Sequence, residues 1–65
     1  MKKQVENRII EILNENPGFE TYQMKEKLEL TLNTTNKYLK TMAIEEKIER
    51  KAFGSPWTYH YYSKK

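Results

Sequence analysis

The sequence contains no cysteine and no aspartate, and it has one histidine and two glycines. Without cysteine, neither a disulfide framework nor a zinc–thiolate site can support the fold. With His60 as the lone histidine, neither a Ser-His-Asp triad nor a multi-histidine metal site can be assembled. Gly18 and Gly54 stand alone, so a glycine-rich phosphate loop is missing too. We therefore expect no enzymatic activity, no metal centre and no cofactor.

Long apolar segments are also missing. The longest apolar run is Met42-Ala43-Ile44, whereas a helix that crosses a bilayer needs roughly 20 such residues. The Lys2-Lys3 start lacks the apolar stretch of a signal peptide. We expect a soluble cytoplasmic protein without a membrane partner, located in the host cytoplasm if a virus or plasmid encodes it. Its 65 residues leave no room for a cleft between domains, so no small-molecule ligand is expected.

Charge is abundant and unevenly distributed. The chain carries 12 basic and 9 acidic residues, for a net charge of +3. Residues 1–30 hold five basic and six acidic residues, whereas residues 31–65 hold seven and three, a balance of +4. This segregation points to a polyanionic partner for the second half of the chain.

Apolar periodicity predicts two helices in the acidic half. The first spans about 4–16 and ends at Asn16-Pro17-Gly18, because proline disfavours helix before it and glycine permits the turn. Phe19-Glu20 is a candidate for a very short strand. The second helix spans about 21–29, with Thr21 as its N-cap. Its expected buried face is formed by Tyr22, by Met24 or the stem of Lys25, and by Leu28.

A third helix is predicted over about 32–46, with Thr31 as its N-cap. Thr35, Leu39 and Met42 follow the spacing of one buried helical stripe. No carboxylate occurs between Thr31 and Ile44. The other face consists of amides, hydroxyls and lysines: Asn33, Thr34, Asn36, Lys37, Lys40 and Thr41. A face of this composition suits the surface of a polyanion.

From Ile48 onward the period changes from that of a helix to that of a strand, which predicts a β-hairpin over about 48–62 with a turn at Gly54-Ser55-Pro56. Trp57, Tyr59 and Tyr61 share one strand face. Core packing or support of the hairpin is the favoured role for these aromatics, and stacking on unpaired bases is the alternative. Trp57 and Tyr62 are the least settled of the set.

The order of helix, helix, helix and hairpin resembles the winged helix-turn-helix family. The resemblance covers nearly the whole chain and centres on Leu28-x-Leu30-Thr31-x-x-x-Thr35-x-x-x-Leu39-x-x-Met42. Lys47-Ile48-x-Arg50 follows, with Glu46 at the position where the family commonly has glycine. The resemblance implies an α+β fold in a single domain, residues 1–65, with three helices and a C-terminal β-hairpin wing.

The resemblance also implies a function. It predicts a sequence-specific regulator of transcription that binds double-stranded DNA, most simply a repressor, similar to the compact regulators of phages, archaeal viruses and plasmids. Helix 32–46 would enter the major groove, where Asn33 and Asn36 can pair with adenine and Thr34 can meet a phosphate or a thymine methyl. Lys37 and Lys40 would contact phosphates or guanine. The plainer reading of the amides and hydroxyls is that they cap and solubilise a surface helix.

The hairpin offers a second candidate contact surface. Its expected DNA contacts are Arg50, Lys51, Ser55 and Trp57. The equal alternative is that Arg50 and Lys51 only keep a solvent-exposed strand edge from pairing with another chain. A domain this small reads only a few base pairs, so specific binding is expected to require two copies on one DNA site. The expected dimer is a weak homodimer that forms mainly on DNA.

Three other readings remain open. The chain is also similar to Z-DNA-binding winged helices through Asn36, Lys37, Pro56 and Trp57, although Lys40 stands where those proteins have tyrosine and no spacer separates Pro56 from Trp57. The domain can instead be a winged helix that binds other proteins and not DNA. The aromatic hairpin can instead bind single-stranded nucleic acid or RNA.

Overall fold

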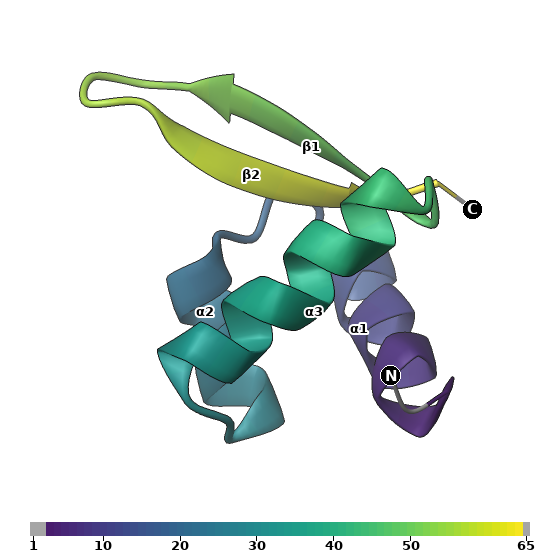
Figure 1. The fold of residues 1–65 in the computed structure, drawn as a ribbon. Helices are drawn as coiled ribbons and strands as arrows, with labels where there is room; N and C mark the ends of the chain where they lie inside the picture. The colour runs from purple at the N-terminus through teal and green to yellow at the C-terminus, as the bar shows by residue number, and fades with distance from the viewer. Residues whose placement is uncertain (1–2, 65) are drawn as a thin grey trace.

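The computed structural model describes residues 3–64, which form three helices followed by an antiparallel hairpin (Figure 1). The elements are α1 (Lys3–Glu15), α2 (Thr21–Leu28), α3 (Leu32–Ile44), β1 (Ile48–Phe53) and β2 (Thr58–Ser63). The predicted α+β fold is confirmed. None of the helices that residues 3–64 form has both the length and the apolar character needed to cross a membrane.

The core lies where the helices meet the base of the hairpin. Its fully buried apolar side chains are Ile9, Ile12, Leu13, Met24, Leu39, Met42, Ile48 and Tyr61. Thr35 is buried with them. The predicted inner face of the third helix, Thr35, Leu39 and Met42, is therefore confirmed, because side chains three and four residues apart lie on one side of a helix.

The start of α2 differs from the prediction. Its N-cap is Glu20, which has extended backbone, and Thr21 is already the first helical residue. The side-chain oxygen of Gln23 accepts a hydrogen bond from the Glu20 N–H at 3.0 Å, which satisfies this donor at the helix start. Tyr22 is 62% exposed, so it does not belong to the buried face. Met24 is buried, and Tyr22, two residues away, points to the other side of the helix.

The third helix ends at Ile44, two residues before the predicted limit. Glu46 adopts a left-handed backbone with φ 61°. Its N–H donates to the Ala43 carbonyl at 3.1 Å, and the Lys47 N–H donates to the Met42 carbonyl at 2.9 Å. This pair of bonds is the Schellman arrangement that normally places glycine at the left-handed position. Glu46 thus occupies the conformation that glycine would adopt most easily.

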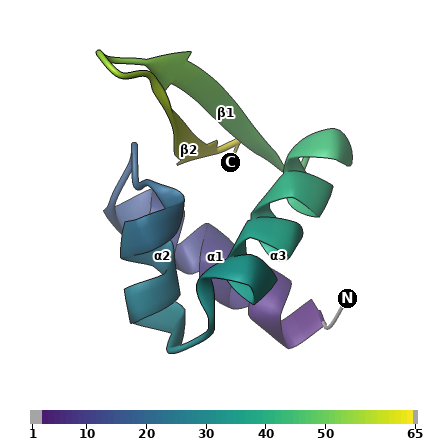
Figure 2. The same cartoon turned by 60° about the vertical axis from the view of Figure 1, so that its left-hand side comes forward.

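The hairpin pairs Ile48 with Ser63 at its base and Phe53 with Thr58 near its turn. Its turn projects beyond the helices in both views (Figures 1 and 2). Trp57 lies in this turn and is 63% exposed, so of the two roles favoured for the hairpin aromatics, core packing does not apply to it.

The segment between α1 and α2 pairs with the outer edge of β2, the edge that does not face β1. The Tyr61 N–H donates to the Phe19 carbonyl at 2.8 Å, and the Gly18 N–H donates to the Tyr61 carbonyl at 2.9 Å. The short strand predicted at Phe19-Glu20 therefore appears as a single bridge, between Phe19 and Tyr61. This bridge holds the base of the hairpin against the helices.

Candidate nucleic-acid interface

The first turn of α3 is fixed by Thr31, as predicted. The Thr31 hydroxyl oxygen accepts a hydrogen bond from the Thr34 N–H at 3.2 Å. The same hydroxyl donates to the Thr34 hydroxyl oxygen at 2.9 Å. The cap satisfies one of the free donors at the helix start and holds the Thr34 side chain back toward the N-cap.

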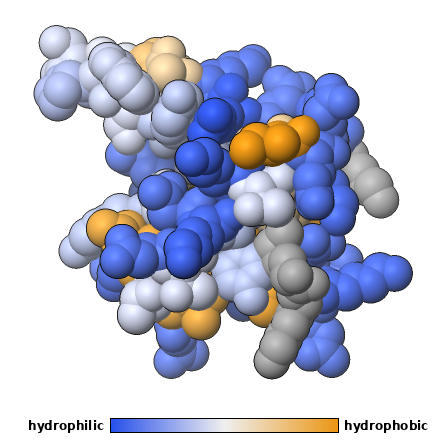
Figure 3. All heavy atoms as spheres, viewed as in Figure 1, coloured by the Kyte–Doolittle hydropathy of each residue, from blue (hydrophilic) through white to orange (hydrophobic). Residues whose placement is uncertain are grey.

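The polar face of α3 lies in solvent. All six predicted contact residues of this helix are exposed: Asn33, Thr34, Asn36, Lys37, Lys40 and Thr41. At about 100° per residue, Lys37 lies opposite the buried stripe, Asn36 and Lys40 lie on one side of it, and Thr34 and Thr41 lie on the other. Figure 3, which shows the side of the molecule seen in Figure 1, is mainly hydrophilic with small separate apolar patches.

One flank of this face contains a shallow hollow of about 260 Å³. It is lined by Thr34, Lys37, Tyr38 and Thr41. Tyr38 is half-buried and packs against the core, so its ring forms the fixed part of the lining. Tyr38 was missing from the predicted contact residues, although its spacing of four from Thr34 and three from Thr41 places all three on one side of the helix.

The hairpin separates its two predicted cations. The Arg50 guanidinium lies 4.4 Å from the centre of the Tyr59 ring, and the Lys51 ammonium lies 5.4 Å from the centre of the Tyr62 ring. Adjacent residues of a strand point to opposite faces of the sheet. Arg50 therefore shares the face of the buried Ile48, while Lys51 lies on the other face. The two predicted DNA contacts of this strand therefore point to different sides of the hairpin, and their contact with DNA stays a prediction.

The end of the hairpin carries exposed aromatic rings. The Trp57 ring meets Tyr59 edge-on, with centroids 5.2 Å apart and planes at 73°. On the opposite face, Phe53 stacks on His60 with centroids 4.1 Å apart, and Phe53 is 50% exposed. Ser55, in the turn between the strands, is also exposed. Phe53 was not predicted as a contact residue, although it directly precedes the turn in the sequence.

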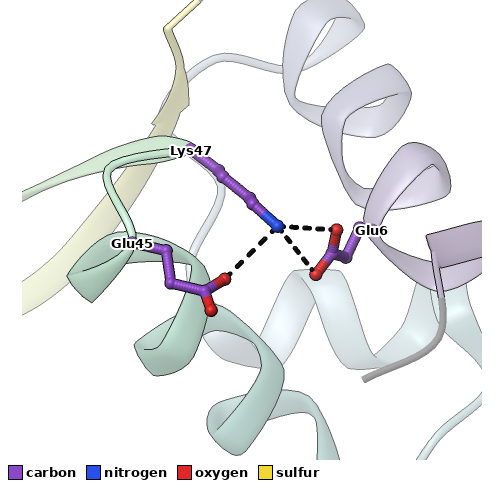
Figure 4. Close-up of polar contacts among 3 residues, drawn as sticks. All are labelled: Glu6, Glu45 and Lys47. Carbon is purple, nitrogen blue, oxygen red and sulfur yellow. Dashed lines mark hydrogen bonds and ion pairs between the residues drawn. The ribbon is translucent and has the colours of Figure 1, made fainter.

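The positive charges between residues 31 and 64 fall into two groups. Lys47 forms ion pairs with Glu6 at 3.0 Å and Glu45 at 3.3 Å (Figure 4). Hydrogen bonding to the Glu6 carboxylate raises the pKa of Lys47, burial opposes this rise, and Glu45 adds to it. Lys64 lies 3.8 Å from Glu46. By contrast, four cations form no ion pair with any residue from 3 to 64: Lys37, Lys40, Arg50 and Lys51.

The described residues offer no cluster of three or more histidine or acidic side chains that would hold a metal ion. No protein-family model, no curated protein and no solved structure matches the chain. The candidate interface is therefore defined by its own geometry: an acid-free helix face beside a projecting hairpin.

Proposed function

We propose that the chain is a winged helix-turn-helix regulator that binds double-stranded DNA in a sequence-specific manner. The observation that carries this proposal is the exposed face of α3, which is polar, free of carboxylates and carries two lysines without ion pairs within residues 3–64. A surface of this kind attracts phosphates and offers hydrogen-bonding groups to base edges. The arrangement of three helices and a hairpin is compatible with a winged helix.

In this proposal the residues of α3 divide by chemistry. Asn36 and Asn33 present an amide donor and acceptor, which suits bidentate pairing with adenine in the major groove. The charges of Lys37 and Lys40 neutralise phosphates, and this part of their contribution carries no sequence information. The hairpin is the wing, and Arg50 with Ser55 and Trp57 at its end contacts the flanking backbone. A domain that occupies its site in this way acts as a repressor in the cytoplasm, as a weak dimer formed mainly on DNA.

Selection of binding sites from random duplexes tests this proposal. A variant of the protein is then measured on the selected site. Asn36→Ala should lower affinity for that site by about 1–3 kcal/mol and affinity for random duplex far less, because a bidentate amide contact is specific to a base. Asn7→Ala is the matched control, since Asn7 is an exposed asparagine on α1. A selection without any consensus, or equal losses on both duplexes, would contradict sequence reading by Asn36.

Binding of single-stranded nucleic acid is the second candidate, and the exposure of two aromatic rings at the hairpin end favours it. Trp57 is 63% exposed and Phe53 is 50% exposed, and exposed rings are what unpaired bases stack on. Trp57 is the single tryptophan of the chain, so its fluorescence reports on the hairpin alone. Stronger quenching by a single strand than by the matching duplex would favour this candidate over the first.

A further inference from the structure

The hollow on the flank of α3 has a more specific use if α3 lies in the major groove. It is lined by Tyr38, two threonines and Lys37, and its surface is mainly apolar. A volume of about 260 Å³ admits the edge of a base. On the basis of the function proposed above, we infer that this hollow receives the 5-methyl group of thymine.

An apolar group suits the hollow because its exposed surface is mainly apolar, and the Thr34 hydroxyl oxygen already accepts a hydrogen bond from Thr31 at 2.9 Å. Tyr38 packs against the core, so the ring stays in place when the ligand is absent. The thymine methyl is the apolar group that the major groove displays, and threonine methyls are among its usual contacts.

Lys37 distinguishes thymine from 5-methylcytosine, which carries the same methyl group. The ammonium of lysine donates hydrogen bonds and cannot accept them. Beside its methyl group, thymine presents the O4 acceptor, whereas cytosine presents an N4 amino group, which is a donor. Because Lys37 lines the hollow, its positive charge favours thymine and repels the cytosine amine.

Charge also distinguishes DNA from a protein as the occupant. The helix has no carboxylate from Leu32 to Ile44, and Lys37 and Lys40 have no ion pair among residues 3–64. A protein partner would have to combine an apolar side chain for the hollow with carboxylates for both lysines, whereas DNA carries phosphates on both sides of its groove throughout.

The test compares alternating dA–dT duplex with alternating dA–dU duplex, which differ only in the 5-methyl group. We expect the protein to bind the dU duplex about fourfold more weakly for each methyl that the hollow takes from water. Thr41→Ser removes one methyl from the lining and should bring the two affinities closer together. Thr21→Ser is the matched control on α2 and should leave the ratio as it is.

A second arm compares alternating dG–dC duplex with its 5-methylcytosine form, where we expect no gain in affinity. Equal affinity for the dT and dU duplexes would overturn the inference and leave DNA binding intact. A gain with 5-methylcytosine as large as that with thymine would overturn the choice of base. Failure to bind any duplex would overturn both the inference and the proposed function. A change in self-association of the free Thr41→Ser protein, measured by sedimentation, would assign the hollow to a protein contact instead.

Discussion

Two regions of α3 and its surroundings use the same residue type in opposite ways. On the exposed face of the helix, Lys37 and Lys40 have no ion pair within the described residues, 3–64. Just beyond the helix end, Lys47 lies between Glu6 and Glu45, and the Glu6 side chain is only 13% exposed. We call this second region, Glu6 with residues 45–47, the corner.

The difference shows why a charge count overstates a binding surface. The second half of the chain has a balance of +4, yet Lys47 and Lys64 pair with carboxylates of the same chain. These two lysines connect elements of the fold, whereas the α3 lysines remain available to a partner. Substitutions on the face should therefore change binding and leave stability alone, and substitutions in the corner should do the reverse.

The largest expected effect comes from removing both lysines of the face. Lys37→Gln combined with Lys40→Gln should reduce the slope of log affinity against log salt by about 2, because each phosphate contact contributes roughly 0.9. At 0.1 M salt this corresponds to a loss in duplex affinity on the order of 10- to 100-fold. Fluorescence anisotropy over a salt series measures both quantities.

Lys47→Gln is the matched control, because it removes the same charge from the corner. Its slope should stay close to that of the parent chain. If the double substitution leaves the slope unchanged, or if Lys47→Gln lowers it by a full unit, the division of charges between the face and the corner is wrong.

Glu46→Gly should stabilise the corner. Glycine adopts φ 61° without the steric penalty that a side chain meets there. The expected gain in the free energy of unfolding is about 1 kcal/mol, measured by urea denaturation, and duplex affinity should not change. Glu46→Ala removes the contact with Lys64 but keeps a Cβ, so it should give no such gain. Equal effects of the two substitutions would show that backbone strain at residue 46 is not the cause.

Thr35→Val examines the inner side of the same helix. The Thr35 hydroxyl is fully buried and has no hydrogen-bond partner among the described residues. Valine keeps the shape and removes the unsatisfied oxygen, so the free energy of unfolding should rise by on the order of 1 kcal/mol. Thr35→Ser keeps the hydroxyl, removes the methyl and should lower it. A destabilised valine variant would mean that the hydroxyl has a partner, such as buried water.

The smallest effect concerns the pH dependence of the corner. The folded pKa of Lys47 lies above its ordinary value of 10.5, chiefly because of the Glu6 hydrogen bond. Its contribution to stability is therefore complete below the unfolded pKa and is lost as pH rises through the folded pKa. Lys47→Gln should melt at a slightly lower temperature than the parent at neutral pH, and the two should converge at strongly alkaline pH. A difference that persists there would rule out the charge of Lys47 as its origin.

The sequence predicts the features that depend on spacing along one element. The buried stripe of Thr35, Leu39 and Met42 and the cap at Thr31 follow from helical periodicity and local hydrogen bonding. Periodicity also accounts for the exposure of Asn36, although its contact with DNA stays a prediction. The separation of Arg50 from Lys51 follows from the alternation of a strand, so attention to that alternation would have predicted it.

Contacts between distant residues could not be predicted in this way. Glu6 and Lys47 are 41 residues apart, and the residues around each of them do not indicate that the two will pair. Trp57 and Tyr61 fit the same alternation, yet one is exposed and the other buried, because the hairpin extends past the helices that would cover its end. Burial of an aromatic residue here depends on how far the helices reach.

The bridge between Phe19 and Tyr61 also affects how fast the protein folds. It joins positions 42 residues apart in the sequence, so the chain must close a long loop before these backbone hydrogen bonds form. Helical contacts and the hairpin turn involve much shorter separations and form earlier. We expect docking of the preformed hairpin onto the Phe19 segment to be the late step of folding, which makes the attachment of the hairpin a kinetic landmark as well as a structural one.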